Sequence, residues 1–111
     1  MRVLFDHGTP APLARALDGH DVRFAKGEGW DTFANGALLA AAEAGGFHVL
    51  VTTDKNIRYQ QKLAGRAIAI VVLLNAQWPV LRQHVHKVRA AVDAAQPGGH
   101  VEVAIESDRR R

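Results

Sequence analysis

The segment 67–74, with the sequence AIAIVVLL, contains only apolar residues, and this feature constrains the fold more than any other. A continuous apolar run of this length is typical of a strand in a parallel sheet that is covered on both faces. Shorter runs of the same kind at 3–5 and 49–51 lead into Asp6 and Asp54. We therefore expect a parallel sheet buried between helices, with two strands that are each followed by an acid.

Strand and helix signals alternate along the chain. The segments with strand character are 2–5, 20–25, 47–53, 67–74 and 101–105. The helix signals are a Pro-bearing turn capped by Thr9, an Ala-rich run capped by Asn35, and the segments 55–63 and 80–95. This alternation predicts an α/β fold in which right-handed crossovers connect the strands and helices cover both faces. We expect a single domain over 1–106 and a disordered basic tail at 107–111.

Composition narrows the chemistry of the chain. It has no cysteine, which excludes disulfides, thiolate metal sites and cysteine nucleophiles, so a metal ion would need oxygen or imidazole ligands. The formal net charge of +3 equals the charge of the C-terminal Arg109, Arg110 and Arg111, so the rest of the chain is nearly balanced. The N-terminal segment fits neither a signal peptide nor a membrane span, and we expect a cytoplasmic protein with no membrane partner.

Asp6 and Asp54 are the candidate site residues. Both follow predicted parallel strands and should lie at the edge of the sheet where ligands of such folds bind. Two carboxylates brought together repel each other unless one is protonated or both bind a cation. Mg²⁺ or Mn²⁺ prefers carboxylate oxygens and keeps water that can act as a nucleophile, which favours phosphodiester hydrolysis. The alternative interpretation is that each Asp only caps the turn and helix that follow it.

Basic side chains near these acids are the candidate nucleic-acid contacts. They are Lys55, Arg58, Lys62 and Arg66. Lys55 and Arg58 come at the start of a predicted helix, whose free backbone N–H groups also attract phosphate. His7 follows the first acid and has the chemistry to ligate metal, to hold phosphate when protonated, or to transfer a proton. A solvated helix face and a surface-turn histidine are the simpler interpretations of these residues.

Other polar residues are weaker candidates. Asp31 and Glu43 are further acids, but Glu43 lies about two turns into its helix, about 12 Å along the axis, and should face away from the strand ends. His84 and His86 are two residues apart on a predicted helix. Side chains at that spacing point to different faces, so we expect no metal-binding pair there.

Two stretches resemble the landmarks of compact bacterial PIN-like domains. The opening RVLFDHGTPAPLARALDGHDV is similar to the family's first strand, which ends in Asp and is followed by a Pro-bearing turn and a helix. The stretch NGALLAAAEAGGFHVLVTTDKNIRYQQ is similar to the second landmark, a helix beginning with Asp or Asn that leads into a strand ending in Thr-x-Asp-Lys-Asn/Asp. The two stretches cover 2–22 and 35–61.

The resemblance implies a three-layer α/β/α PIN-like domain with a mainly parallel central sheet. It also implies a Mg²⁺- or Mn²⁺-dependent endoribonuclease, the toxin half of a toxin–antitoxin pair, with RNA as substrate, an antitoxin-type protein partner and a homodimer. By position, Asp6 would be the first metal-binding acid and Asp54 the late one. Asn35 stands where many relatives carry a third carboxylate, and His7 stands where Glu is common. An amide can ligate through its oxygen but adds no charge, so metal binding should be weaker.

Two alternative functions stay open at this point. One is a catalytically weakened PIN-like module that binds RNA or a protein partner, which the short set of acids and Asn35 favour. The other is a receiver-like or nucleotide-binding α/β domain. The sequence has neither a Gly-rich phosphate loop nor a second acid next to Asp6, which speaks against that option.

Overall fold

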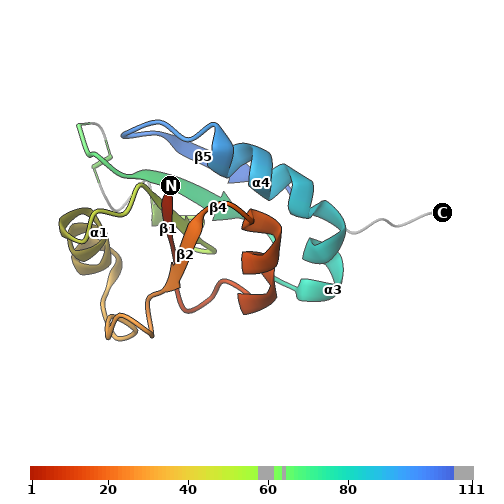
Figure 1. Cartoon of the computed structure of the whole chain (residues 1–111), viewed down its shortest axis with the longest axis horizontal. Coiled ribbons are helices and arrows are strands. Elements are labelled where there is room, and N and C mark those ends of the chain that lie inside the picture. Colours follow the sequence, from red (N-terminus) through yellow and green to blue (C-terminus); the bar gives the residue numbers. More distant parts are fainter. Residues whose placement is uncertain (58–61, 64, 107–111) are drawn as a thin grey trace.

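The structure of the chain is a computed structural model that describes residues 1–57, 62, 63 and 65–106. Five short strands form one sheet in which every neighbouring pair is parallel (Figure 1). They are β1 (Arg2–Phe5), β2 (Asp21–Phe24), β3 (Val49–Thr52), β4 (Ala69–Leu73) and β5 (His100–Val103). Their order across the sheet is β2-β1-β3-β4-β5. The prediction of an α/β fold with a parallel sheet is confirmed.

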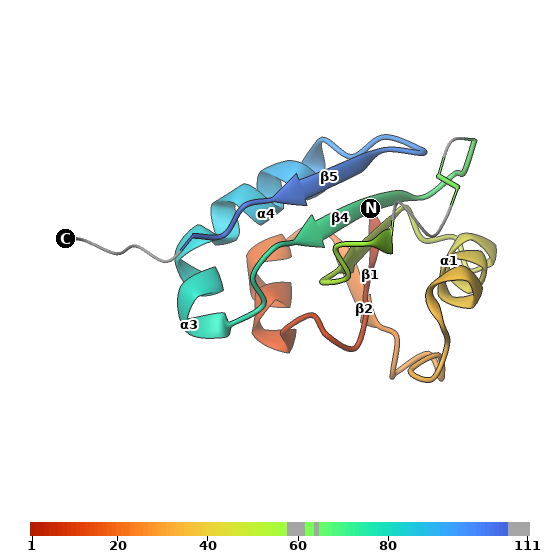
Figure 2. The ribbon, with the colours of Figure 1, turned by 180° about the vertical axis from the view of Figure 1, so that it is seen from behind.

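Helical segments connect most of these strands. They are the 3-10 helix η1 (Ala11–Leu17), α1 (Asn35–Ala44), and the succession α3 (Trp78–Leu81), η2 (Arg82–His84) and α4 (Val85–Asp93). Seen from behind, α4 runs along β5 on the side of η1, and α1 lies at the other end of the molecule (Figure 2). In the part of the chain that the structure describes, no helix has the length and apolar content needed to cross a bilayer.

The three central strands β1, β3 and β4 are buried on both faces, and their successive residues point to opposite sides of the sheet. One face packs against η1 and α4, with Val3, Phe5, Leu13, Leu17, Val49, Val51, Val71, Leu73, Leu81, Val88, Val92, Val103 and Ile105. The other packs against α1, with Leu4, Ala25, Leu38, Leu39, Ala42, Phe47, Leu50, Ile57, Ile68, Ile70 and Val72. The strand β4 divides its residues between both clusters, which explains its unbroken apolar run. Burial of each large aliphatic side chain contributes about 1.5–3 kcal/mol.

The crossover connections do not all have the same hand. The connections from β2 to β3 and from β4 to β5 advance in the same direction across the sheet, yet α1 and α4 pack on opposite faces. Crossovers of that kind have opposite hands, so the prediction that all of them are right-handed is wrong. Apolar contacts with η1 hold α4 on its face, and Arg89 Nη1 adds a hydrogen bond to the carbonyl of Ala16 at 3.1 Å.

Two predicted helices differ from those observed. The segment 80–95 is interrupted by the 3-10 turn η2, so α4 begins only at Val85. The helix after β1 is not capped by Thr9: its N-cap is Pro10, and the Thr9 hydroxyl bonds to Asp6 Oδ1 at 2.8 Å and contacts the carbonyl of Val51 at 3.0 Å. The helix that follows starts at Ala11 and is of the 3-10 type. Residues 58–61 of the predicted helix 55–63 and the predicted tail 107–111 lie outside the described residues.

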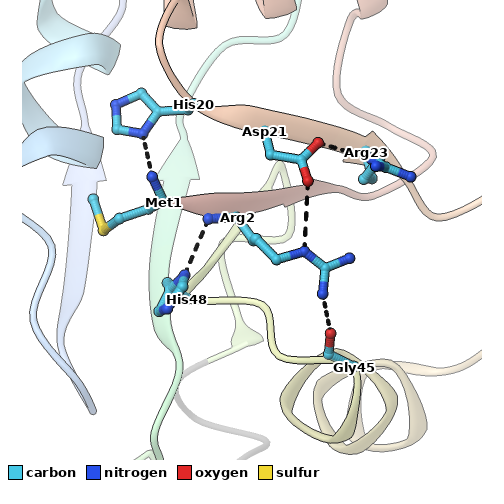
Figure 3. Close-up of polar contacts among 7 residues, drawn as sticks. All are labelled: Met1, Arg2, His20, Asp21, Arg23, Gly45 and His48. Atoms are coloured by element: carbon cyan, nitrogen blue, oxygen red, sulfur yellow. Dashed lines mark hydrogen bonds and ion pairs between the residues drawn. The ribbon is translucent and has the colours of Figure 1, made fainter.

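Polar contacts fix the amino-terminal edge of the sheet (Figure 3). The guanidinium of Arg2 donates to the carbonyl of Gly45, and its carbon lies 4.3 Å from the ring centroid of Phe47, a cation–π geometry. Its Nε also lies 3.6 Å from Asp21 Oδ2. Arg23 Nε donates to Asp21 Oδ1 at 2.8 Å, and this hydrogen bond holds the pKa of the Asp21 carboxyl below its usual value. The contacts of Arg2 therefore hold β1 against β2 and against the end of α1.

Candidate functional site

The ends of β1 and β3 form the candidate site. The two strands are neighbours, and the chain leaves β1 toward β2 on one side but leaves β3 toward β4 on the other. In an open parallel sheet, such a switch point leaves a crevice outside the carboxyl ends of the strands, and ligands bind there. Asp6 directly follows β1, and Asp54 is separated from β3 by one residue. Both predicted acids therefore lie at the edge where the topology favours a site.

Asp6 is held firmly in place by the protein. Its side chain is buried, with 9% of the residue exposed. Its Oδ1 accepts hydrogen bonds from the backbone N–H of Gly8 at 3.1 Å and the hydroxyl of Thr9 at 2.8 Å, and its Oδ2 accepts one from Thr52. These contacts close the turn after β1. Asp6 therefore caps the turn that follows it, as the alternative interpretation of the sequence expects. The same hydrogen bonds fix the orientation of its carboxylate.

Thr52 links the two acids. It is fully buried at the end of β3, where its hydroxyl donates to Asp6 Oδ2 and accepts from the backbone N–H of Asp54 at 3.1 Å. The sequence prediction did not include this residue. The signal was present, because a hydroxyl residue two positions before an acid can accept the backbone N–H of that acid.

Asn35 contacts the second acid directly. Its Nδ2 donates to Asp54 Oδ2, and the backbone N–H of Asn56 donates to Asp54 Oδ1 at 2.9 Å. The helix α1 begins at Asn35 and has Ala34 as its N-cap, so the prediction that Asn35 caps the helix is wrong. The reason is that the Asn35 side chain reaches to Asp54. Hydrogen bonds therefore connect the Asp54 carboxylate to Asn35, and the Asp54 backbone to the Asp6 carboxylate through the Thr52 hydroxyl.

Gly8 allows the loops after β1 and β3 to approach each other. A Cβ atom at this position would lie 2.7 Å from Thr53 Oγ1, closer than real side chains pack. The backbone N–H of Gly8 is also one of the donors to Asp6. The loop that orients Asp6 therefore passes directly against the loop that leads to Asp54, and a side chain at position 8 would require Thr53 to move.

The structure describes two of the three residues that we predict to contact nucleic acid. His7 and Lys55 are both exposed, each adjacent in the chain to one of the two acids. Arg58 lies outside the described residues. Exposed cationic and imidazole groups at this edge have the chemistry to meet a phosphate, so these two assignments stay predictions.

The weaker candidates are not part of this site. Glu43 is half-buried, pairs with Arg66 Nη1 at 2.6 Å and accepts the backbone N–H of Ala67 at 2.9 Å. The prediction that Glu43 faces away from the strand ends is therefore confirmed. Asp31 is exposed in the segment before α1. His84 Nε2 donates to the carbonyl of Glu106 at 2.8 Å, which connects η2 to the segment after β5.

The donor set suits a hard divalent cation in type and in capacity. A carboxylate has about four acceptor positions, of which Asp6 uses three and Asp54 uses two in contacts with described residues. Carboxylate and amide oxygens are the ligands that Mg²⁺ and Mn²⁺ prefer. Among residues 1–57, 62, 63 and 65–106, no three His, Cys, Asp or Glu side chains gather into a metal-binding group. A cation would therefore depend on two carboxylates, with Asn35 as a neutral ligand.

Comparisons of the chain with protein-family models, curated proteins and solved structures find no match. The resemblance to PIN-like domains therefore stays a prediction that depends on the two motif stretches. The same holds for the PIN-like three-layer arrangement and for the homodimer. The observations that bear on function are the topology of the sheet and the contacts of Asp6, Thr52, Asp54 and Asn35.

Proposed function

We propose that the protein is a Mg²⁺- or Mn²⁺-dependent endoribonuclease of the PIN-like type, acting as the toxin of a toxin–antitoxin pair. The observation that supports this function is the position of Asp6 and Asp54 at the ends of adjacent parallel strands, where one Thr52 hydroxyl bonds to the Asp6 carboxylate and to the Asp54 backbone. RNA is the proposed substrate, and an antitoxin-type protein is the proposed partner.

Each proposed site residue has a definite task. Asp6 and Asp54 would hold the cation, with Asn35 beside them. When bound, Mg²⁺ or Mn²⁺ supplies positive charge that polarises a phosphodiester and lowers the pKa of water. The hydrogen bonds to Asp6 and Asp54 orient both carboxylates before the substrate arrives, which reduces the reorganisation that catalysis requires. His7 and Lys55 are the proposed contacts for RNA phosphates.

Cleavage of RNA in the presence of Mn²⁺ tests this function. The wild-type protein should cut the RNA, and Asp6→Asn and Asp54→Asn should each lose cleavage because each removes one of two ligand charges. Asp18→Asn, a change of the same kind at an exposed acid that follows η1, is the matched control and should cut like the wild type. Equal cleavage by Asp6→Asn, Asp54→Asn and the wild type, all folded by circular dichroism, would remove the proposal.

A catalytically weakened PIN-like module that binds RNA or a protein partner is the second candidate. It is favoured by a specific observation: protein donors already fill three acceptor positions of Asp6, and Asn35 offers its amide N–H to Asp54 instead of a charge. Calorimetric titration with Mn²⁺ separates the two functions. A binding site at millimolar Mn²⁺ that is lost in Asp54→Asn supports the nuclease, and the absence of any binding heat supports the module.

A further inference from the structure

A groove of about 460 Å³ lies between η1 and the α3–η2–α4 segment. In both ribbon views, α3 lies beside the beginning of η1 (Figures 1 and 2). The groove is lined by Pro12, Arg15, Ala16, Trp78, Arg82 and Val85. None of these residues takes part in the contacts of Asp6 and Asp54, so this surface is separate from the candidate metal site.

The groove contains an aromatic residue and two cations. Trp78 is half-buried: part of it packs against the core cluster under η1 and α4, and part of it lines the groove. Arg15 comes from η1 on one wall, and Arg82 comes from η2 on the other; both are exposed. The remaining lining is apolar and contains no carboxylate. The groove therefore combines a flat apolar ring with a positive charge on each of its two walls.

The two cations are available for a ligand. Arg15 and Arg82 make no hydrogen bond or ion pair through their side chains with any residue that the structure describes. By contrast, Arg23, Arg66 and Arg89 each pair with a carboxylate of the protein. Guanidinium groups bind phosphate through two parallel N–H groups, so an unpaired Arg on each wall favours a polyanion.

We propose that this groove binds single-stranded RNA, with one base stacked on Trp78 and the flanking phosphates on Arg15 and Arg82. An aromatic ring and two cations in one groove match the base and the phosphates that a nucleotide chain presents. Stacking on an aromatic side chain accepts any base, so this contact binds RNA without reading its sequence. The inference goes beyond the nuclease proposal, since the binding requires neither a metal ion nor the two acids.

Fluorescence of Trp78 reports directly on the groove. The chain has two tryptophans, so the Trp30→Phe variant leaves Trp78 as the sole indole. Titration with a 12-nucleotide oligouridylate in EDTA should quench Trp78 saturably. In Arg15→Gln/Arg82→Gln, the slope of log affinity against log salt should fall by about 1.4, since each phosphate contact on a single strand contributes about 0.7. Arg23→Gln/Lys26→Gln makes the same change in net charge away from the groove and should keep the slope.

A second pair of variants tests the stacking itself. Trp78→Phe keeps an aromatic face and should bind the labelled oligouridylate like the wild type, whereas Trp78→Leu should bind about tenfold more weakly in fluorescence anisotropy. Thermal unfolding checks that both variants are folded. The proposal is overturned if Trp78→Phe and Trp78→Leu weaken binding equally. It is also overturned if the slope of log affinity against log salt falls by the same amount in both double charge variants. Quenching by an acidic Leu-containing peptide, with no quenching by the oligouridylate, would also overturn it and assign the groove to a protein partner.

The outcome is independent of the nuclease test. Loss of RNA cleavage in Asp6→Asn with unchanged quenching of Trp78 would support both proposals. Quenching in a wild-type protein that cuts no RNA with Mn²⁺ would refute only the nuclease, and cleavage without any quenching would refute only the groove.

Discussion

Replacement of Thr52 by Val tests the contact that joins the two halves of the site. Thr52 is 0% exposed, and its hydroxyl serves Asp6 Oδ2 and the backbone N–H of Asp54. Valine has nearly the same shape, so no cavity forms, but both partners lose their hydrogen bond. A bond to a charged group is worth about 1.5–3 kcal/mol and a neutral one about 1 kcal/mol. The extra buried methyl group of Val stabilises the fold by about 0.8 kcal/mol. We therefore expect the free energy of unfolding to fall by about 2–3 kcal/mol in total.

Urea unfolding of Thr52→Val, Asp6→Asn and the double variant measures this contact as a coupling free energy. Both single changes disturb the same hydrogen bond, so their effects should fall short of additivity by about 1 kcal/mol or more. Thr52→Ser keeps the hydroxyl and serves as the control, with unchanged Mn²⁺-dependent activity. Effects of Thr52→Val and Asp6→Asn that add to within about 0.3–0.5 kcal/mol would refute the reasoning.

Two further changes probe the same edge of the sheet. Asn35→Asp adds a third carboxylate and should tighten Mn²⁺ binding in calorimetry, while the loss of the amide donor to Asp54 lowers the metal-free unfolding free energy by about 1–3 kcal/mol; unchanged affinity would argue against a cation beside Asp54. Gly8→Ala puts a Cβ atom 2.7 Å from Thr53 Oγ1 and should lower the free energy of unfolding in urea by about 1 kcal/mol or more. The loss should be smaller when Gly8→Ala is made in the Thr53→Ala background. An equal loss in both backgrounds would contradict the close approach.

The sheet could be predicted from sequence because each strand carries its own signal. A strand that is covered on both faces has no polar residues to interrupt it, and β4 (Ala69–Leu73) divides its side chains between the two core clusters. The position of Asp6 and Asp54 at one edge follows from parallel pairing alone, because every strand of such a sheet ends on the same side. These features depend on local sequence and on a general rule of topology.

The features that could not be predicted depend on contacts between distant segments. Thr9 has the sequence signature of a helix cap, but its hydroxyl bonds to the carboxylate of Asp6 and not to the helix. Asn35 also stands at a helix start, but Asp54, which lies 19 residues away in the chain, takes its amide. The helix α4 shares its core cluster with η1, a segment about 70 residues earlier in the chain, so the face on which it packs is not visible in its local sequence. In each case a tertiary partner overrides a local preference that the sequence alone displays.

Crystals of the protein soaked in Mn²⁺ would test the central claim most directly, through anomalous scattering from the metal. The account predicts a Mn²⁺ peak at the ends of β1 and β3, coordinated by carboxylate oxygens of both Asp6 and Asp54. A fully soaked crystal with no peak there, or with a peak that neither carboxylate coordinates, would contradict it.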